Sequence, residues 1–318
     1  MAHKNRKKGV AIQALVIANA TVDETYHVAR LPANGESLTG QLRAHDVGGK
    51  GANVATVLSR CAIATKLVAV VGNDIRGNYI KSELQQESME LDLVQSTRCS
   101  TDISLINVDD TGENTIVTTV EAAHSLEPSR ACGALDELRA NGLLVLQGNL
   151  TESLTSLLIS KARQCGIRVV FNPSPLCPWM ASVVPTVDTV FMNAVEALAI
   201  TGRIGEAAVL AVLETGPAQV VLTRGENNVL LGTRSNNTGL PDQYTVDSVP
   251  SKHTQVVDAT GAGDTYLAVA LASAARRGCP LDVVALTHAA SAAAQTVSFH
   301  GTRGAFPTSA TLKRILAS

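Results

Sequence analysis

The sequence predicts an α/β fold in which a doubly wound, mainly parallel sheet is flanked by helices. The first observation is that strand-like apolar runs alternate with segments of helical spacing along most of the 318 residues. The second is composition: 45% of residues are hydrophobic but only 3% are aromatic, as suits Val- and Ala-rich strands packed between helices. The third is a pair of glycine-rich turns that join strand-like to helical segments. In such a fold, ligands bind at the carboxyl ends of the strands.

The individual elements follow from periodicity. Six runs have the continuous apolar character of buried strands, at 10–18, 65–71, 142–147, 168–172, 189–192 and 219–223. Five stretches between them have helical spacing, at 51–61, 77–87, 152–164, 195–201 and 206–214. Another helix is expected to rise from Asp264, and 232–244 is expected to be a polar loop.

Two segments, about 21–46 and 100–120, interrupt this alternation. Polar and apolar residues alternate in them around turn sequences at 32–35 and 109–112. We expect them to form one small antiparallel β lid beside the binding edge, where it would exclude water from reactive phosphates. Two separate surface hairpins are the alternative. A lid with exposed edges often pairs with a second copy, so we expect a homodimer through the lid.

The amino terminus is basic and then apolar. Lys4 to Lys8 followed by the apolar run 10–20 imitates a signal peptide, but Gln13 and Asn19 interrupt that run. We therefore expect 1–9 to be a disordered basic tail and 10–318 to be one large α/β domain.

Composition also excludes several classes of partner. The formal net charge is −2, so there is no basic excess for binding nucleic acid or an anionic membrane. No apolar run approaches the roughly 20 residues of a membrane span. Six cysteines are scattered with no C-x-x-C pair, which indicates reduced thiols and a cytoplasmic protein.

The turn Gly261-Ala262-Gly263 lies between a strand-like end at 256–257 and an Ala-rich helix. Its small residues let the backbone approach a ligand, and the first amides of the helix form a site for a phosphate or an oxyanion. Asp264 follows at once. A carboxylate there would repel phosphate unless it accepts a proton from the attacking group; the alternative is an ordinary acid favoured by the helix dipole.

The second turn is Gly48-Gly49-Lys50-Gly51-Ala52-Asn53, which opens another helix with a cation beside its amides. It is not a Walker A loop, because Gly51 stands where a Ser or Thr would hold magnesium. The turn at Gly261 is not a dinucleotide fingerprint either, because Tyr266 replaces the third glycine. Protein-kinase motifs are missing.

Together these turns resemble the two signatures of the ribokinase-like, phosphofructokinase-B-type family of carbohydrate kinases, and ribokinases most closely. The first signature corresponds to Gly48–Asn53 and the second to Asp258–Asp264. The similarity continues at Asn172-Pro173-Ser174-Pro175, Asn193-Ala194-Val195-Glu196, Thr223-Arg224-Gly225 and His288-Ala289-Ala290. It covers nearly the whole chain from about residue 10.

The resemblance implies transfer of the γ-phosphate of ATP to a sugar hydroxyl. It makes Asp264 the general base, and the amides of Gly261, Ala262 and Gly263 the anion hole. The residues that match the family's nucleotide contacts are Asn193, Thr223, Gly225, Gly261, Gly263 and His288. Taken alone, His288 would be a satisfied core histidine.

The resemblance also implies metal ions. Asn193 and Glu196 match a motif associated with Mg²⁺, held through water as magnesium prefers. Without the resemblance, Glu196 would be a solvated acid in the first turn of a helix. A monovalent cation such as K⁺ is often held near Asp258 and the segment 298–305.

The residues that match the substrate contacts are Asp23, Gly49, Lys50, Asn53, Asn149 and Asp264. Two positions depart from the ribokinase pattern: Thr21 replaces Asn, and Asn149 replaces Glu. An amide donates as well as accepts, so these changes can redirect specificity. Ribose or a related free sugar is the first expectation. A nucleoside or phosphosugar kinase and a non-catalytic sugar or nucleotide sensor are alternatives, although 101–120 contains no Lys or Arg to bind a phosphosugar.

Overall fold

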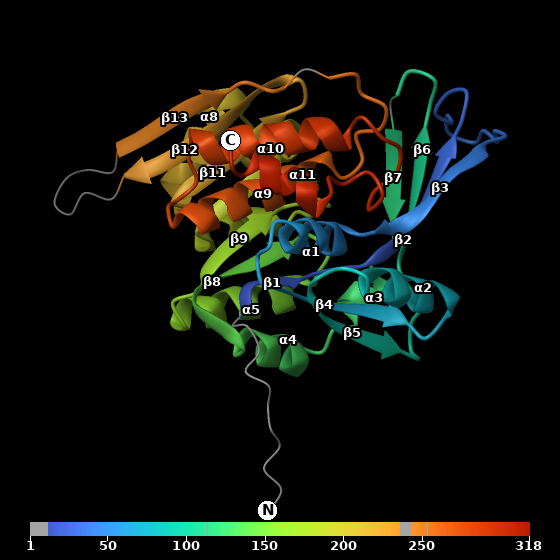
Figure 1. The fold of residues 1–318 in the computed structure, drawn as a ribbon, viewed down its shortest axis with the longest axis horizontal. Coiled ribbons are helices and arrows are strands. Elements are labelled where there is room, and N and C mark those ends of the chain that lie inside the picture. The colour runs from blue at the N-terminus through green and yellow to red at the C-terminus, as the bar shows by residue number, and fades with distance from the viewer. Residues whose placement is uncertain (1–11, 113, 236–242, 253) are drawn as a thin grey trace, which may run out of the picture.

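The structure is a computed structural model that describes residues 12–112, 114–235, 243–252 and 254–318. Within these residues, the strands form a nine-stranded main sheet and a four-stranded small sheet (Figure 1). In spatial order the main sheet consists of β13 (Gln243–Val249), β12 (Asn227–Ser235), β11 (Gln219–Arg224), β10 (Thr189–Asn193), β9 (Arg168–Asn172), β8 (Leu138–Gln147), β1 (Ile12–Ile17), β4 (Thr65–Gly72) and β5 (Glu90–Ser96). The predicted tail 1–9 lies outside the described residues.

The strand order reverses at β1. From there the chain adds β4 and β5 on one side, and then β8 to β11 on the other, all in parallel. Only β12 and β13, at one edge, pair antiparallel. Reversal of strand order opens a crevice between the carboxyl ends of β1 and β8, and this is where ligands bind in doubly wound folds.

Helices cover both faces of the main sheet (Figure 1). One face packs against α1 (Lys50–Arg60), α2 (Ile75–Leu84), α9 (Ala262–Arg277), α10 (Val283–Thr296) and α11 (Ser309–Ile315). The other face packs against α3 (Glu121–His124), α4 (Pro128–Leu135), α5 (Glu152–Gln164), α6 (Met180–Val183), the 3₁₀ helix η1 (Val184–Thr186), α7 (Ala194–Thr201) and α8 (Gly205–Thr215). The strands alternate between the faces: in β1, Val16 packs with the first set and Leu15 with the second. None of the described helices is both long and apolar enough to cross a bilayer.

The small sheet joins the two segments that interrupt the alternation. Its strands are β3 (Gln41–Gly48), β2 (Thr21–His27), β6 (Ile103–Val108) and β7 (Asn114–Thr118), in that spatial order. Each segment forms an antiparallel hairpin, but β2 and β6 pair in parallel, with Asp23 opposite Ser104. The expectation of a purely antiparallel lid is therefore wrong for the central pair. The reason is that β1 and β5 run in the same direction in the main sheet. Strands β2 and β6 follow them along the chain, so they leave the carboxyl end of that sheet in the same direction.

The six predicted strands and five predicted helices are confirmed, with small shifts at their ends. Two details differ. Helix α9 begins at Ala262, two residues before Asp264, so the carboxylate lies within the first helical turn. The expected loop at 232–244 is instead the end of β12 and the start of β13, and its central residues 236–242 lie outside the described part.

Candidate active site

Two cavities meet at the carboxyl edge of the main sheet. The large cavity, about 470 Å³, lies between this edge and the small sheet. Its lining combines residues that follow β1 and β8, the starts of α1 and α9, and inward-facing residues of β2, β6 and β7. The small cavity, about 330 Å³, lies between the loop after β11, the segment after β13, and helices α9 and α10. Thr223, Ala259 and Gly263 line both cavities, so the Gly261 turn (residues 258–263) stands where they meet.

Each glycine of the first turn is required by a close contact. A Cβ on Gly48 would lie 1.9 Å from Asp23 Oδ2, so the missing side chain makes room for that carboxylate. Gly49 has a φ of 87°, and a Cβ there would lie 2.8 Å from the backbone nitrogen of Thr21. On Gly51 it would lie 2.5 Å from Ala18 Cβ. The turn therefore presses α1 against β1 and carries Lys50 into the large cavity.

The two glycines of the second turn differ in their surroundings. Gly261 is the N-cap of α9 in the left-handed conformation, φ 75°, and a Cβ there would lie 2.6 Å from the Phe306 ring. Around Gly263 nothing lies within 4 Å of the position of a Cβ, so packing does not require glycine there. No side chain caps the helix start. Open space beside the uncapped amides of a long helix is suited to an approaching anion.

Asp264 is deeply buried between the two turns. Its side chain is 6% exposed, and its Oδ2 accepts a hydrogen bond of 2.8 Å from Asn53 Nδ2 of α1. Burial raises the pKa of the Asp264 carboxyl, while the charge of Lys50 and the Asn53 hydrogen bond act in the opposite direction. Lys50 makes no salt bridge within 4.0 Å to any described residue. Its charge is therefore available to a ligand in the large cavity.

Asp23 lies on the inward face of β2 and is 5% exposed. Burial raises the pKa of its carboxyl to about 6, although hydrogen bonds from Thr21 and Ser104 oppose this shift. The Thr21 hydroxyl donates to Asp23 Oδ1 at 2.6 Å. Thr21, which departs from the ribokinase pattern, thus supports Asp23 and is not part of the cavity lining.

Asn149 follows β8 and lines the large cavity. It is 1% exposed, and its Oδ1 has no hydrogen-bond partner among the described residues. A buried acceptor without a donor is costly, at about 1–3 kcal/mol. An acceptor of this kind is satisfied when a ligand brings a hydroxyl or an amine to it.

The six predicted nucleotide residues separate into three groups. Asn193 and Gly261 line only the large cavity, while Gly263 lines both. Thr223 and Gly225, at and after the end of β11, line the small cavity. His288 does not line either cavity, because Ala290, Ala293 and Ala294 form the cavity face of α10 and residue 288 is turned by about 200° from residue 290. Its Nδ1 lies 2.8 Å from Ser273 Oγ in the helix interface. This contact fits the alternative of a core histidine, and the nucleotide contact expected for His288 stays a prediction.

Comparison with known proteins agrees with this geometry. The family model described as "pfkB family carbohydrate kinase" matches residues 15–309, nearly the whole chain. The chain belongs to the pfkB family of carbohydrate kinases.

Three curated relatives of this family member are each 26% identical. The ribokinase of Bacillus subtilis aligns over 95% of this chain and 98% of its own length. For the ribokinase of Mus musculus the shares are 81% and 80%, and for the deoxyribokinase of Salmonella typhi they are 79% and 82%. Among solved structures, ribokinase from Giardia lamblia superposes with a TM-score of 0.85 at 22% identity, covering 97% of this chain and 99% of that one. The last comparison supports the fold.

The residues of this pfkB kinase that match a magnesium motif form the start of α7. Asn193 Oδ1 accepts from the Glu196 amide at 2.9 Å, and Glu196 Oε2 accepts from the Asn193 amide at 2.8 Å, which is a reciprocal capping box. Burial raises the pKa of Glu196, opposed by hydrogen bonds and by Lys50. No described group of three or more His, Cys, Asp or Glu side chains could enclose a metal. A single carboxylate nevertheless fits Mg²⁺, which keeps most of its waters and arrives with phosphates.

Asp258 secures the Gly261 turn of the kinase. It is 4% exposed; Oδ1 accepts from the Thr260 amide at 2.9 Å and Oδ2 from the Gly301 amide at 3.0 Å. These bonds hold the turn against the segment 298–305. A buried carboxylate whose described partners are both neutral amides fits a nearby cation.

Sequence reasoning missed most of the small sheet's contribution to the site. Ser104, Ile106, Ile116 and Thr118 line the large cavity. Their period-two spacing on β6 and β7 was visible in the sequence, but which face is inward depends on pairing between distant segments. Asn19 and Ser174 were also missed as lining residues. For the small cavity, the apolar lining at Val229, Val256 and Val297 had no sequence pattern to distinguish it from core.

Proposed function

We propose that this pfkB kinase transfers the γ-phosphate of ATP to one hydroxyl of a neutral free sugar, with ribose or a close relative as the first candidate. The observation that carries the proposal is the position of Asp264. Its carboxylate lines the large cavity and lies one residue beyond Gly263, which lines both cavities. A sugar in the large cavity and a nucleotide in the small cavity would meet at this point.

Asp264 is the proposed general base. The attacking hydroxyl gives its proton to the Asp264 carboxylate as its oxygen bonds to phosphorus and the bond from phosphorus to the departing ADP breaks. The hydrogen bond from Asn53 orients the carboxylate, and burial makes it a stronger base by raising its pKa. Because the transition state is loose, the proton can leave late, so a carboxylate is basic enough.

The Gly261 turn is the proposed anion hole. Amides of Gly261, Ala262 and Gly263 would donate to the phosphoryl oxygens, supported by the positive end of the 16-residue α9 dipole. Lys50, with no salt bridge of its own among the described residues, would neutralise part of the charge that develops on the transferred group.

Glu196 and Asn193 are the proposed magnesium residues, acting through water at the start of α7. When bound, Mg²⁺ neutralises charge on the nucleotide phosphates. We also propose a monovalent cation such as K⁺ beside Asp258 and the 298–305 carbonyls, where the buried carboxylate has only amide partners among the described residues.

The large cavity favours a neutral polyhydroxy ligand. Asp23, Asn149 and Asn53 offer acceptors and amide donors to hydroxyl groups. Lys50 is the only Lys or Arg among the described residues lining it, and its charge already acts to lower the pKa of Asp264 and Glu196. A phosphosugar would need a second basic group. This observation argues for a free sugar over a phosphosugar.

The outer face of the small sheet is the proposed homodimer surface. Leu42, Leu105 and Val117 lie on the face opposite the cavity and are 56%, 38% and 66% exposed. Apolar groups on a sheet with open edges are typical of association between copies. The free cysteines found in the described residues fit a reducing compartment, and we propose a cytoplasmic location.

The proposal is tested by measuring ADP release from ATP with purified protein against pentoses, hexoses, nucleosides and sugar phosphates. We expect the highest kcat/KM with a neutral sugar, ribose or a relative. Higher kcat/KM with a nucleoside or a sugar phosphate would contradict the substrate class. Sugar and nucleotide binding with no ADP release in any reaction would instead indicate a sensor.

A further inference from the structure

The loop that follows α10 supports the Gly261 turn from behind. The Gly301 amide donates to Asp258 at 3.0 Å, and the Phe306 ring packs against Gly261 so closely that a Cβ there would lie 2.6 Å from it. The loop 301–306 has no strand or helix of its own to fix it. The position of the proposed anion hole therefore depends on what holds this loop.

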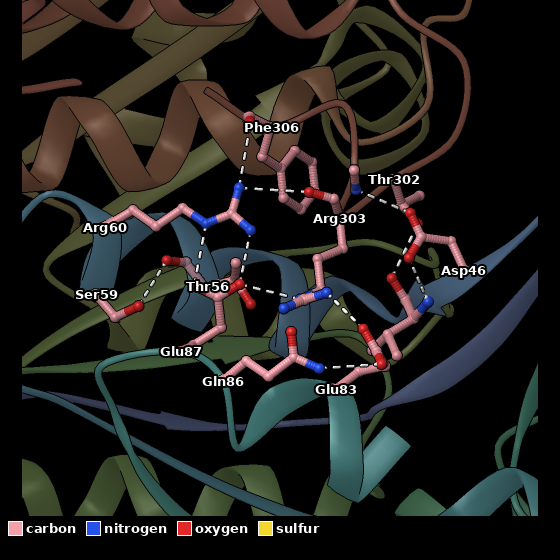
Figure 2. A network of polar contacts seen from close by, with 12 residues as sticks. Asp46, Thr56, Ser59, Arg60, Glu83, Gln86, Glu87, Thr302, Arg303 and Phe306 are labelled. Carbon is pink, nitrogen blue, oxygen red and sulfur yellow. Dashed lines mark hydrogen bonds and ion pairs between the residues drawn. The ribbon is translucent and has the colours of Figure 1, made fainter. Parts of the chain in front are cut away.

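Two arginines and one glutamate hold it, and we call Arg60, Glu87 and Arg303 the arginine clasp (Figure 2). Arg60, the last residue of α1, donates to Glu87 at 3.1 and 2.6 Å through Nε and Nη2. Its Nη1 donates to the carbonyls of Phe306 at 3.1 Å and Arg303 at 3.4 Å. Arg303 donates through Nε to Glu87 at 3.0 Å, and through Nη1 to Glu83 at 2.8 Å.

The clasp has the features of a positioning device. The side chains of Arg60 and Arg303 are each 15% exposed and that of Glu87 is 8% exposed, so water competes little for these bonds. Burial acts to raise the pKa of Glu87, but the two guanidinium groups outweigh it and hold the pKa below its ordinary value. Buried ion pairs often add little net stability, whereas planar guanidinium groups fix geometry well.

The same loop also contacts the strand that leads into the first glycine turn. Asp46 Oδ2 accepts from the Gly304 amide at 2.9 Å, and the Thr302 hydroxyl donates to the Val47 carbonyl at 2.9 Å (Figure 2). These bonds hold the loop at β3, while the clasp holds it at the ends of α1 and α2. The loop is thus bound both to the strand that leads into the first glycine turn and to the helix that follows that turn.

We propose that the arginine clasp sets the position of the anion hole, and that Arg303 is a positioning residue for phosphoryl transfer although it does not line either cavity. This proposal rests on the proposed kinase function. A displacement of about 1 Å at a reacting centre can cost about 10²-fold in rate. Loss of the clasp therefore lowers kcat and leaves the sugar contacts at Asp23 and Asn149 in place.

The test compares Arg303→Met with wild type. We expect kcat to fall at least tenfold, sugar KM to change less than threefold, and amide hydrogen exchange in 256–264 to become faster. Arg98→Met is the matched control, because it breaks an ion pair with Glu127 whose partners are 76% and 63% exposed. It should change none of these values.

Two further variants keep the test decisive if Arg303→Met does not fold. Glu87→Gln removes the charge that both arginines share, and should give the same loss. Arg303→Lys keeps a cation without the planar fork, and should recover part of kcat. Values of kcat within twofold of wild type in these variants, with unchanged exchange, would overturn the proposal. If wild type phosphorylates no sugar but exchange still accelerates, the clasp stands and the proposed function fails.

Discussion

Glycine has two purposes at this site, and they can be separated by substitution. Gly48 is required by the fold, because a Cβ there would overlap the Asp23 carboxylate. Gly263 is in open space within the first turn of α9. The resemblance to family motifs pointed to both residues, but only the coordinates show that Gly48 makes room for a side chain whereas Gly263 borders open space.

We predict that Gly263→Ala separates activity from stability. Replacing glycine by alanine in a helix stabilises by about 0.5–1 kcal/mol, while the new methyl group occupies the space a phosphate needs. The melting temperature should stay the same or rise, and kcat should fall at least tenfold. Gly133→Ala in α4 is the matched control, since its Cβ also meets nothing within 4 Å. A Gly263→Ala enzyme with wild-type kcat would contradict the anion hole.

Asp23 should make sugar affinity depend on pH. Its folded pKa is about 6, so the carboxyl becomes ionised as pH rises through 6. An ionised carboxylate accepts stronger hydrogen bonds from hydroxyl groups. We expect the sugar Kd measured by calorimetry to decrease between pH 5 and pH 7.5. The Kd of Asp23→Asn should be higher than that of wild type and should not change with pH. A wild-type Kd independent of pH would remove Asp23 from the contact.

The same shift predicts a gain of stability in ligand-free Asp23→Asn. A raised folded pKa contributes stability that is complete below the unfolded value, near pH 4, and is lost as pH rises through about 6. Above pH 6 wild type therefore bears the cost of a buried charge, roughly 3 kcal/mol, which the amide avoids. Urea unfolding at pH 5 and pH 7.5 should show the variant's advantage growing with pH. An advantage that does not grow would contradict the assigned shift.

Residue roles were only partly predictable from the sequence. The sequence could not give the distance in space between the two glycine turns. The motifs at these turns nevertheless pointed to Asn53 and Asp264, whose Nδ2 and Oδ2 atoms lie 2.8 Å apart. The sequence could not show whether His288 faces a cavity, because the orientation of α10 relative to the cavity depends on how α10 packs on α9. The Thr21 hydroxyl bonded to Asp23 could not be foreseen either, since a hydrogen bond depends on rotamers and on burial.

At the scale of elements, the buried strands were the most predictable. Strands such as β4 and β9 are covered on both faces, and their central residues, 67–71 and 169–171, are therefore all apolar. Strand β5 was missed because it is a half-exposed edge strand with Glu, Asp and Gln among its residues. Helix α10 was missed because its Ala-rich sequence has almost no polar face to reveal a period.

If the small sheet acts as a lid, its cavity-facing side chains should contribute to sugar binding. Ile116 of β7 lines the large cavity and is 50% exposed, so closure over a sugar would bury it further. We expect Ile116→Ser to lower kcat/KM for the sugar about fivefold, the equivalent of about 1 kcal/mol of lost apolar burial. Ile75→Ser, at an 88% exposed site on α2, is the control. Equal kcat/KM in Ile116→Ser and wild type would indicate that the small sheet does not close over the sugar.

At the scale of the whole molecule, the reversal of strand order at β1 places the site. It brings the carboxyl ends of β1 and β8 together, and β2 of the small sheet follows directly after β1 along the chain. This architecture followed from the alternation of elements in the sequence. The mixed pairing within the small sheet did not, because strand direction between distant segments is set by the sheet from which they emerge.

The exposed outer face of the small sheet predicts the state of the molecule in solution. Light scattering should give twice the chain mass of 33.1 kDa for wild type. Val117→Glu, which puts a charge into the apolar face, should give the single chain mass. A monomeric wild type, or a Val117→Glu variant that remains dimeric, would show that copies do not associate through this face.

The central claim is that a buried acid at the start of α9 removes the proton from a sugar hydroxyl while the neighbouring amides hold the phosphoryl group. The most direct test is the turnover of Asp264→Asn with the sugar that wild type prefers, alongside its nucleotide affinity by calorimetry. The account predicts unchanged nucleotide affinity and a kcat lower by about 10²–10⁴-fold. A folded variant with near-wild-type turnover would contradict it.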